Sequence, residues 1–95
     1  MGKIRRLVLD TLKPHDPNII ELASRLSDLE GISAVNISIY EMDRNVENAK
    51  ITIEGDNIPY DVVSKVIDEM GASIHSIDEV VAGKMLIDDA ETLQD

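Results

Sequence analysis

The sequence predicts a ferredoxin-like α+β domain, a sandwich with the element order βαββαβ, and three observations support this prediction. Four segments have the apolar content or the alternation of strands, two have the periodicity of helices, and a short polar turn joins the two middle strands. Two βαβ-like halves of this kind form an antiparallel four-stranded sheet in the order 4-1-3-2, with both helices on one face. The 95 residues suffice for one such domain and not for two independent cores.

Residues 4–12 are predicted to form a central strand because apolar side chains occupy both of its faces. Pro14 ends this strand, and Asp16 is expected to cap a helix that has Pro17 at its first position. The apolar residues that follow keep helical spacing as far as Leu29, and they are Ile19, Ile20, Ala23, Leu26 and Leu29. Gly31 is a suitable residue to end this helix.

The middle of the chain predicts a hairpin. Residues 33–42 and residues 49–54 alternate apolar and polar side chains, which is typical of half-buried strands. The polar residues 43–48 are expected to form the turn between them.

A second helix is predicted over residues 58–70, with Asn57 as its N-cap, and a last strand over residues 72–82. Ile74 and Ile77 would face opposite ways in a regular strand, so we expect a bulge there or a sheet covered on both faces. The single domain is expected to span residues 1–84. The segment 85–95 is apolar and then acidic, and its residues Met85, Leu86 and Ile87 are expected to dock on a neighbouring subunit. The alternative is a frayed, solvated tail.

The charge of the chain excludes several function classes. The net charge is −10, although the first fifteen residues hold four basic side chains and one acidic one. An acidic surface repels phosphate backbones, and two tyrosines without Phe or Trp provide no stacking platform, so we expect no nucleic-acid partner. The absence of cysteine excludes disulfides, zinc ribbons and iron–sulfur clusters. With no signal peptide and no apolar run long enough to span a membrane, the predicted location is the cytoplasm.

Three stretches of the sequence resemble a known family. They are Leu-Lys-Pro-His-Asp-Pro at 12–17, the hairpin stretch 36–55, and Ile-His-Ser-Ile-Asp-Glu-Val-Val-Ala-Gly-Lys at 74–84. Together they make nearly the whole chain similar to the archaeal proteins of domain of unknown function 211. This resemblance implies a ferredoxin-like fold, an archaeal source and ring-like homo-oligomers. It implies no activity, because that family has none assigned.

His15 marks the first candidate site, where the first strand passes into the first helix. The backbone N–H groups of a helix start attract anions, and Lys13 and His15 would add donors for a small ligand. The alternative is a turn stiffened by proline, in which the Asp16 carboxylate occupies the place of the anion.

The hairpin carries a second candidate site, for Ca²⁺ or Mg²⁺. Glu41, Asp43 and Glu47 place carboxylates close together, and hard cations prefer such oxygen ligands. The spacing partly matches an EF-hand loop, but Asn48 stands where that loop needs glycine and strands flank it, so an EF-hand is rejected. The alternative is a solvated acidic hairpin without a bound ion.

A third candidate site lies on the last strand. His75 and Glu79 share a face in a regular strand and are expected to meet a common ligand, with Asp78 pointing away. The exposed side of the sheet is also expected to carry Arg6, Asp10, Asn36, Ser38 and Tyr40. The alternative is a polar sheet face or a subunit interface.

These observations leave three hypotheses for the function. The first is a self-assembling domain without catalytic activity, whose homo-oligomer presents a ligand or ion site. Ile4 and Val8 are expected opposite Leu7 and Leu9, which would leave apolar area on the uncovered sheet face. The second hypothesis is a divalent-cation-binding protein, and the third is a small enzyme with His15 or His75 as general base.

Overall fold

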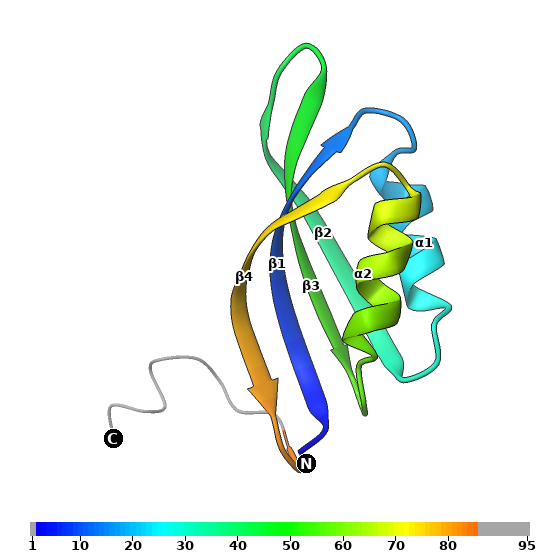
Figure 1. The fold of residues 1–95 in the computed structure, drawn as a ribbon, viewed down its shortest axis with the longest axis vertical. Helices are drawn as coiled ribbons and strands as arrows, with labels where there is room; N and C mark the ends of the chain where they lie inside the picture. The colour runs from blue at the N-terminus through cyan, green and yellow to red at the C-terminus, as the bar shows by residue number, and fades with distance from the viewer. Residues whose placement is uncertain (1, 86–95) are drawn as a thin grey trace.

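The computed structural model describes residues 2–85 and has the predicted element order (Figure 1). The elements are β1 (Ile4–Pro14), α1 (Ile19–Ser27), β2 (Ile32–Met42), β3 (Val46–Gly55), α2 (Tyr60–Glu69) and β4 (Ser73–Ala82). The strands form one antiparallel sheet in the order β2-β3-β1-β4, and both helices lie on the same side of it. The predicted ferredoxin-like fold is therefore confirmed. The predicted docking of segment 85–95 concerns residues that, apart from Met85, lie outside the described residues.

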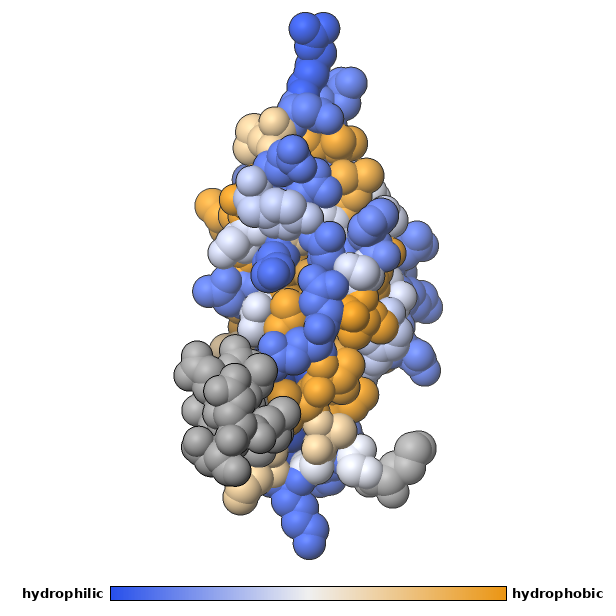
Figure 2. All heavy atoms as spheres, turned by 90° about the vertical axis from the view of Figure 1, so that its left-hand side faces the viewer, coloured by the Kyte–Doolittle hydropathy of each residue, from blue (hydrophilic) through white to orange (hydrophobic). Residues whose placement is uncertain are grey.

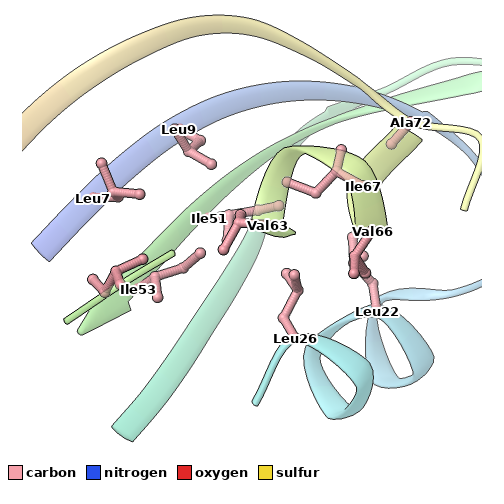
Figure 3. Close-up of a cluster of buried hydrophobic side chains, with 11 residues drawn as sticks. Leu7, Leu9, Leu22, Leu26, Ile51, Ile53, Val63, Val66, Ile67 and Ala72 are labelled. Carbon is pink, nitrogen blue, oxygen red and sulfur yellow. The ribbon is translucent and has the colours of Figure 1, made fainter. Parts of the chain in front are cut away.

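The position of β1 at the centre of the sheet follows from its apolar side chains. Leu7 lies opposite Ile53 of β3 on one side and Val80 of β4 on the other. Leu7 and Leu9 point to the helices, where they join side chains of β3, α1 and α2 in one apolar core (Figure 3). Ile4 also packs against this core, so it does not face the opposite side as the sequence suggested.

The hairpin of β2 and β3 extends beyond the helices at the top of Figure 1. Its turn is shorter than predicted, because residues 46–48 continue the ladder of β3 and leave only residues 43–45 outside the strands. The Asp43 carboxylate accepts hydrogen bonds from the backbone N–H groups of Asn45 and Val46, both at 2.9 Å. A side chain of this kind lets three residues reverse the chain.

Both predicted N-caps were wrong. Asn18 caps α1 by accepting the backbone N–H of Glu21 at 3.0 Å, so the helix begins two residues later than Asp16 and Pro17 suggested. The first turn of α2 follows Pro59 and has no side-chain cap, so Asn57 does not fill that role. Within residues 2–85, neither helix is long and apolar enough to cross a membrane.

The two helices end differently. The left-handed backbone of Gly71 closes α2, with its N–H bonded to the Asp68 carbonyl and the next N–H, from Ala72, bonded to the Ile67 carbonyl. In α1 the C-cap is Asp28, and Gly31 lies three residues further on, in the turn that leads to β2.

The predicted irregularity of β4 is confirmed. Its register against β1 shifts at three places, one of them between the pairs Val8–Glu79 and Leu9–Ile77. Two of these shifts place an extra residue on β4, Asp78 and His75, and the third places the extra residue Arg5 on β1. A bulge changes which face the following side chains point to.

Candidate functional site

Lys13 and Glu47 form a buried ion pair where the ends of β1 and β3 meet. The two residues lie opposite each other in the ladder, and their side chains are 1% and 6% exposed. The Lys13 ammonium lies 3.5 Å from the Glu47 carboxylate and donates a hydrogen bond of 2.7 Å to the carbonyl of Pro14. Burial makes each of these charges dependent on the other, because an unpaired charge away from water is costly.

His15 extends this pair toward the tip of the hairpin. Its Nδ1 lies 3.1 Å from the Glu47 carboxylate, and its Nε2 lies 3.0 Å from the carbonyl oxygens of both Asp43 and Arg44. All three partners are acceptors, so the doubly protonated ring, which donates from both nitrogens, fits best. The bond to Glu47 is the main reason, and the Arg44 carbonyl the next, why the pKa of His15 is raised above its ordinary value. We call this set of contacts the His15 clip.

The clip changes the interpretation of His15 as a ligand-binding residue. Each ring nitrogen already has an acceptor of the protein itself, so neither is presented with a free lone pair. A general base or a metal ligand needs such a lone pair. The geometry is consistent with the alternative of a turn stiffened by proline, and ligand binding by His15 stays a prediction.

The three predicted cation ligands serve different purposes in the hairpin. The hydrogen bonds from Val46 and Asn45 lower the pKa of Asp43, so its carboxylate stays charged while it closes the turn. Glu47 is bound to Lys13 and His15, and Glu41 is exposed on β2. Among residues 2–85, no three histidine or acidic side chains are gathered as a metal site. Cation binding through Glu41, Asp43 and Glu47 stays a prediction.

Arg6 connects three strands on the face of the sheet that the helices leave uncovered, which we call the open face. Its guanidinium lies 2.8 Å from the Glu54 carboxylate of β3 and 3.0 Å from the Glu79 carboxylate of β4. The hydrogen bond to Glu79, followed by the bond to Glu54, raises the pKa of Arg6 further above its ordinary value. Glu79 is thus engaged within the sheet.

The structure does not bring His75 and Glu79 together. His75 borders a groove of about 420 Å³ between β4 and α2, next to Ile74 and Ile77, whereas Glu79 bonds to Arg6 on the open face. Asp78 was expected to point away from Glu79, but it borders a hollow on the open face as well. The bulge between residues 77 and 79 accounts for this difference, because it interrupts the alternation on which the expectation depended.

The hollow on the open face has a volume of about 260 Å³ and is lined by residues of polar and charged type. Its lining residues are Asp10, Ser38, Tyr40, Lys50 and Asp78, so all four strands contribute. The Tyr40 hydroxyl donates a hydrogen bond to Asp10, and this bond is the main reason why the pKa of Tyr40 is raised. Ser38, Tyr40 and Asp10 do therefore share the exposed side of the sheet, as the sequence predicted.

Two of the residues that define these sites were missed as site residues. The sequence predicts Lys13 only as a donor to a small ligand, and it assigns Lys50, within the alternating residues 49–54, no role in a site. A signal for Lys13 was present in the sequence, because Lys13 follows Thr11 by two residues. It therefore lies on the same face of β1 as the buried side chains of Leu7, Leu9 and Thr11. No comparable signal marks Lys50, because its surroundings depend on the positions of the other three strands of the sheet.

Comparisons with known proteins agree with this description. The family model of domain of unknown function 211, described as an uncharacterized ArCR family, matches residues 5–95. This chain belongs to that family. The chain is also 52% identical to the uncharacterized protein MJ0319 of the archaeon Methanocaldococcus jannaschii, over all of this chain and 98% of that protein. The family resemblance predicted from the sequence is therefore confirmed, and neither description names an activity.

Proposed function

We propose that this domain of unknown function 211 protein is a self-assembling domain without catalytic activity, whose homo-oligomer presents a site for a ligand or an ion. The observation that carries this proposal is the exposed apolar margin of β4. Ile77 and Val80 are 48% and 52% exposed, although they lie opposite Leu9 and Leu7 on the face that the helices cover elsewhere. We call this margin, together with the adjoining groove, the β4 margin.

Several features of the β4 margin fit a contact with a second copy of the chain. Burying the exposed half of Ile77 and of Val80 would contribute roughly 1 kcal/mol for each side chain. Figure 2, which views the molecule from the side on which β4 lies in Figure 1, shows apolar surface between polar patches. The groove between β4 and α2 adjoins Ile77 and adds Ile74 to this surface, together with polar side chains such as Ser64 and His75. Contiguous apolar surface of this kind usually marks an interface.

The bulges of β4 indicate what kind of contact this would be. An edge strand with a regular ladder can pair with another strand through its free backbone groups. The register shifts in β4 make its edge irregular, so side-chain packing on Ile77 and Val80 is favoured over a continuous sheet.

The absence of catalysis in this proposal is supported by the two histidines. Both nitrogens of His15 are engaged in the clip. His75 has neither a carboxylate nor a hydroxyl partner within hydrogen-bond distance in the described part of the chain, so no oriented acid–base pair is formed there. Cytoplasmic location is part of the same proposal and has no separate structural support.

Sedimentation velocity at micromolar concentration tests the assembly. We expect wild type to sediment as a species larger than the 10.5 kDa chain. The double variant Ile77→Lys with Val80→Lys should shift toward smaller species. The matched control is Ile20→Lys on α1, because Ile20 is 76% exposed and far from β4 in the fold. A wild-type monomer, or equal behaviour of the two variants, would refute the proposal.

The second candidate is a divalent-cation-binding protein, for which the density of carboxylates in the hairpin remains the motivation. Calorimetric titration with Ca²⁺ or Mg²⁺ should compare wild type with the double variant Asp43→Asn and Glu47→Gln. If the hairpin binds the ion, only wild type releases a saturable heat. Equal heats from both proteins, or none from either, would leave only diffuse attraction by the acidic surface.

A further inference from the structure

The hollow on the open face contains an amine without a partner. Lys50 lies in the ladder between Ser38 of β2 and Asp10 of β1, so it stands beside a carboxylate. Yet within residues 2–85 its ammonium makes no hydrogen bond and has no carboxylate within 4 Å. The Tyr40 hydroxyl is bonded to one oxygen of Asp10 and holds that carboxylate in place.

The second carboxylate of the hollow, that of Asp78, is also held by a hydroxyl group. Ser76 donates a hydrogen bond of 2.7 Å to one oxygen of Asp78. The second oxygens of Asp10 and Asp78 have no hydrogen-bond partner in the described part of the chain. The hollow therefore has one free ammonium on β3, two partly free carboxylates on β1 and β4, and a serine and a tyrosine on β2.

We propose that this hollow binds a small zwitterion of the α-amino-acid class, with the ligand carboxylate on Lys50 and the ligand ammonium between Asp10 and Asp78. An anion would be attracted by Lys50 and repelled by the two carboxylates. A simple cation would pair with the two carboxylates but would be repelled by the ammonium of Lys50. Only a ligand that carries both charges gives the ammonium and the two carboxylates a partner of opposite charge. Hydrogen bonds between charged groups are stronger than those between neutral groups.

The size of the hollow agrees with this class of ligand. Its volume of about 260 Å³ is just below the range of roughly 300–1,000 Å³ that is usual for pockets of drug-sized ligands. One small molecule fits, whereas a nucleotide or a peptide would extend far beyond the walls. The exposed ring of Tyr40 and the methylene stem of Lys50 offer apolar contact for a short side chain of the ligand.

This inference specifies the ligand site of the proposed function but does not depend on self-assembly. All of its lining residues come from one chain, and none of them lines the groove of the β4 margin, although Ser76, which bonds to Asp78, does. The two ideas can therefore fail separately, provided that binding is measured on wild type and also on the variant Ile77→Lys with Val80→Lys.

The test is an NMR titration of the backbone amides with glycine, the smallest zwitterion of the class, followed by the L-amino acids one at a time. We expect saturable shifts at residues of the hollow for at least one of these ligands below about 10 mM. Acetate and methylammonium, each of which carries one of the two charges, should bind at least tenfold more weakly. The same result in the assembly variant would separate binding from oligomerisation.

Two substitutions decide whether the shifts report this site. Lys50→Gln and Asp78→Asn should each weaken binding at least tenfold, while their unchanged amide spectra elsewhere show that the fold is intact. Lys65→Gln on α2 removes the same charge from an exposed position outside the hollow and should leave the affinity unchanged. Absence of saturation with every amino acid, equal binding of methylammonium, or unchanged affinity of Lys50→Gln would overturn the proposal.

Discussion

At the scale of single residues, the ends of β1 and β3 show how charged side chains can form part of a core. Lys13 and Glu47 each occupy a position at which the strand pattern calls for an apolar residue. His15 then covers the pair and contacts the turn of the hairpin. The result is an ion pair followed by hydrogen bonds, which together run from the buried end of β1 to the surface.

The His15 clip predicts a dependence of stability on pH. Its folded pKa is raised above the value of about 6.5 that is typical of an unfolded chain, so folding favours the protonated ring. The contribution of the clip is therefore fully present below about pH 6.5 and is lost as the pH rises through the folded pKa. We expect the difference in free energy of unfolding between wild type and His15→Gln to be largest near pH 5.5 and to shrink above neutrality. Urea denaturation at a series of pH values measures this difference, and a constant difference would contradict the clip.

The buried ion pair predicts strong coupling between two substitutions. Lys13→Met leaves the Glu47 carboxylate buried without its ammonium, which should lower the free energy of unfolding by about 3–5 kcal/mol. The double variant Lys13→Met with Glu47→Leu removes both charges and should lose less than Lys13→Met alone. Urea denaturation of the single and double variants provides the comparison. If the two single effects simply add, the pair is not coupled as the structure indicates.

At the scale of the elements, the sequence was sufficient to predict every helix and strand but not their ends. The apolar periodicity of Leu7 and Leu9, or of Ile51 and Ile53, extends over several residues. A strand predicted from it is therefore still recognised when its boundary is misplaced by a residue or two. An N-cap depends on one residue, and Asp16 and Asn18 are equally suitable by type. The structure selects Asn18 because β1 continues to Pro14, and this moves the start of the helix along the chain.

The candidate sites were less predictable than the elements, for a physical reason. Sites on sheets depend on register, and one bulge changes the face of every following side chain. The bulge beside Asp78 was anticipated from Ile74 and Ile77, but its effect on Glu79 and His75 could not be derived without knowing where it falls. The polar row of the open face was predictable because Asn36 and Ser38 lie in the regular part of β2, and Tyr40 still reaches Asp10 although it is the extra residue at the shift between Ile39 and Glu41.

Two glycines at the ends of elements should respond differently to alanine. At Gly71 a Cβ would meet only the ring of Pro14 at 3.6 Å, so the cost is the left-handed backbone, about 1–2 kcal/mol. At Gly55 a Cβ would collide with the backbone of Gly31 and lie 2.9 Å from Cα of Ile32. We therefore expect Gly55→Ala to lower the thermal midpoint more than Gly71→Ala does. Calorimetric melting of the two variants provides the measurement, and the reverse order would show that β2 and β3 can separate at this end.

At the scale of the whole molecule, the basic side chains that are concentrated near the N-terminus of the sequence are paired with acidic side chains from other strands. The basic side chains near the N-terminus lie on the central strand, where Arg6 meets Glu54 and Glu79 and Lys13 meets Glu47. These pairs neutralise acidic groups of the neighbouring strands. The net charge of −10 that remains acts between molecules as well as within each one.

This net charge predicts how assembly responds to salt. If the apolar β4 margin holds the subunits together, then screening of like charges should promote association. We expect larger species when the ionic strength rises from about 0.01 M to about 0.15 M, since the Debye length falls from about 30 Å to about 8 Å. Sedimentation velocity at the two ionic strengths measures the change. Dissociation on adding salt would show instead that ion pairs form the interface.

The central place of β1 also has a consequence for synthesis on the ribosome. The first strand to emerge has no neighbour in the sheet until β3 is made, and its second neighbour, β4, is the last element of the described chain. Its contacts therefore join residues that are far apart in sequence, such as Leu7 with Val80, and contacts of this kind form slowly. This apolar strand has no neighbour in the sheet until β3 is made, and one of its edges stays unpaired until β4 follows. We expect its charged residues Arg5, Arg6, Asp10 and Lys13 to limit pairing with other nascent chains in that interval.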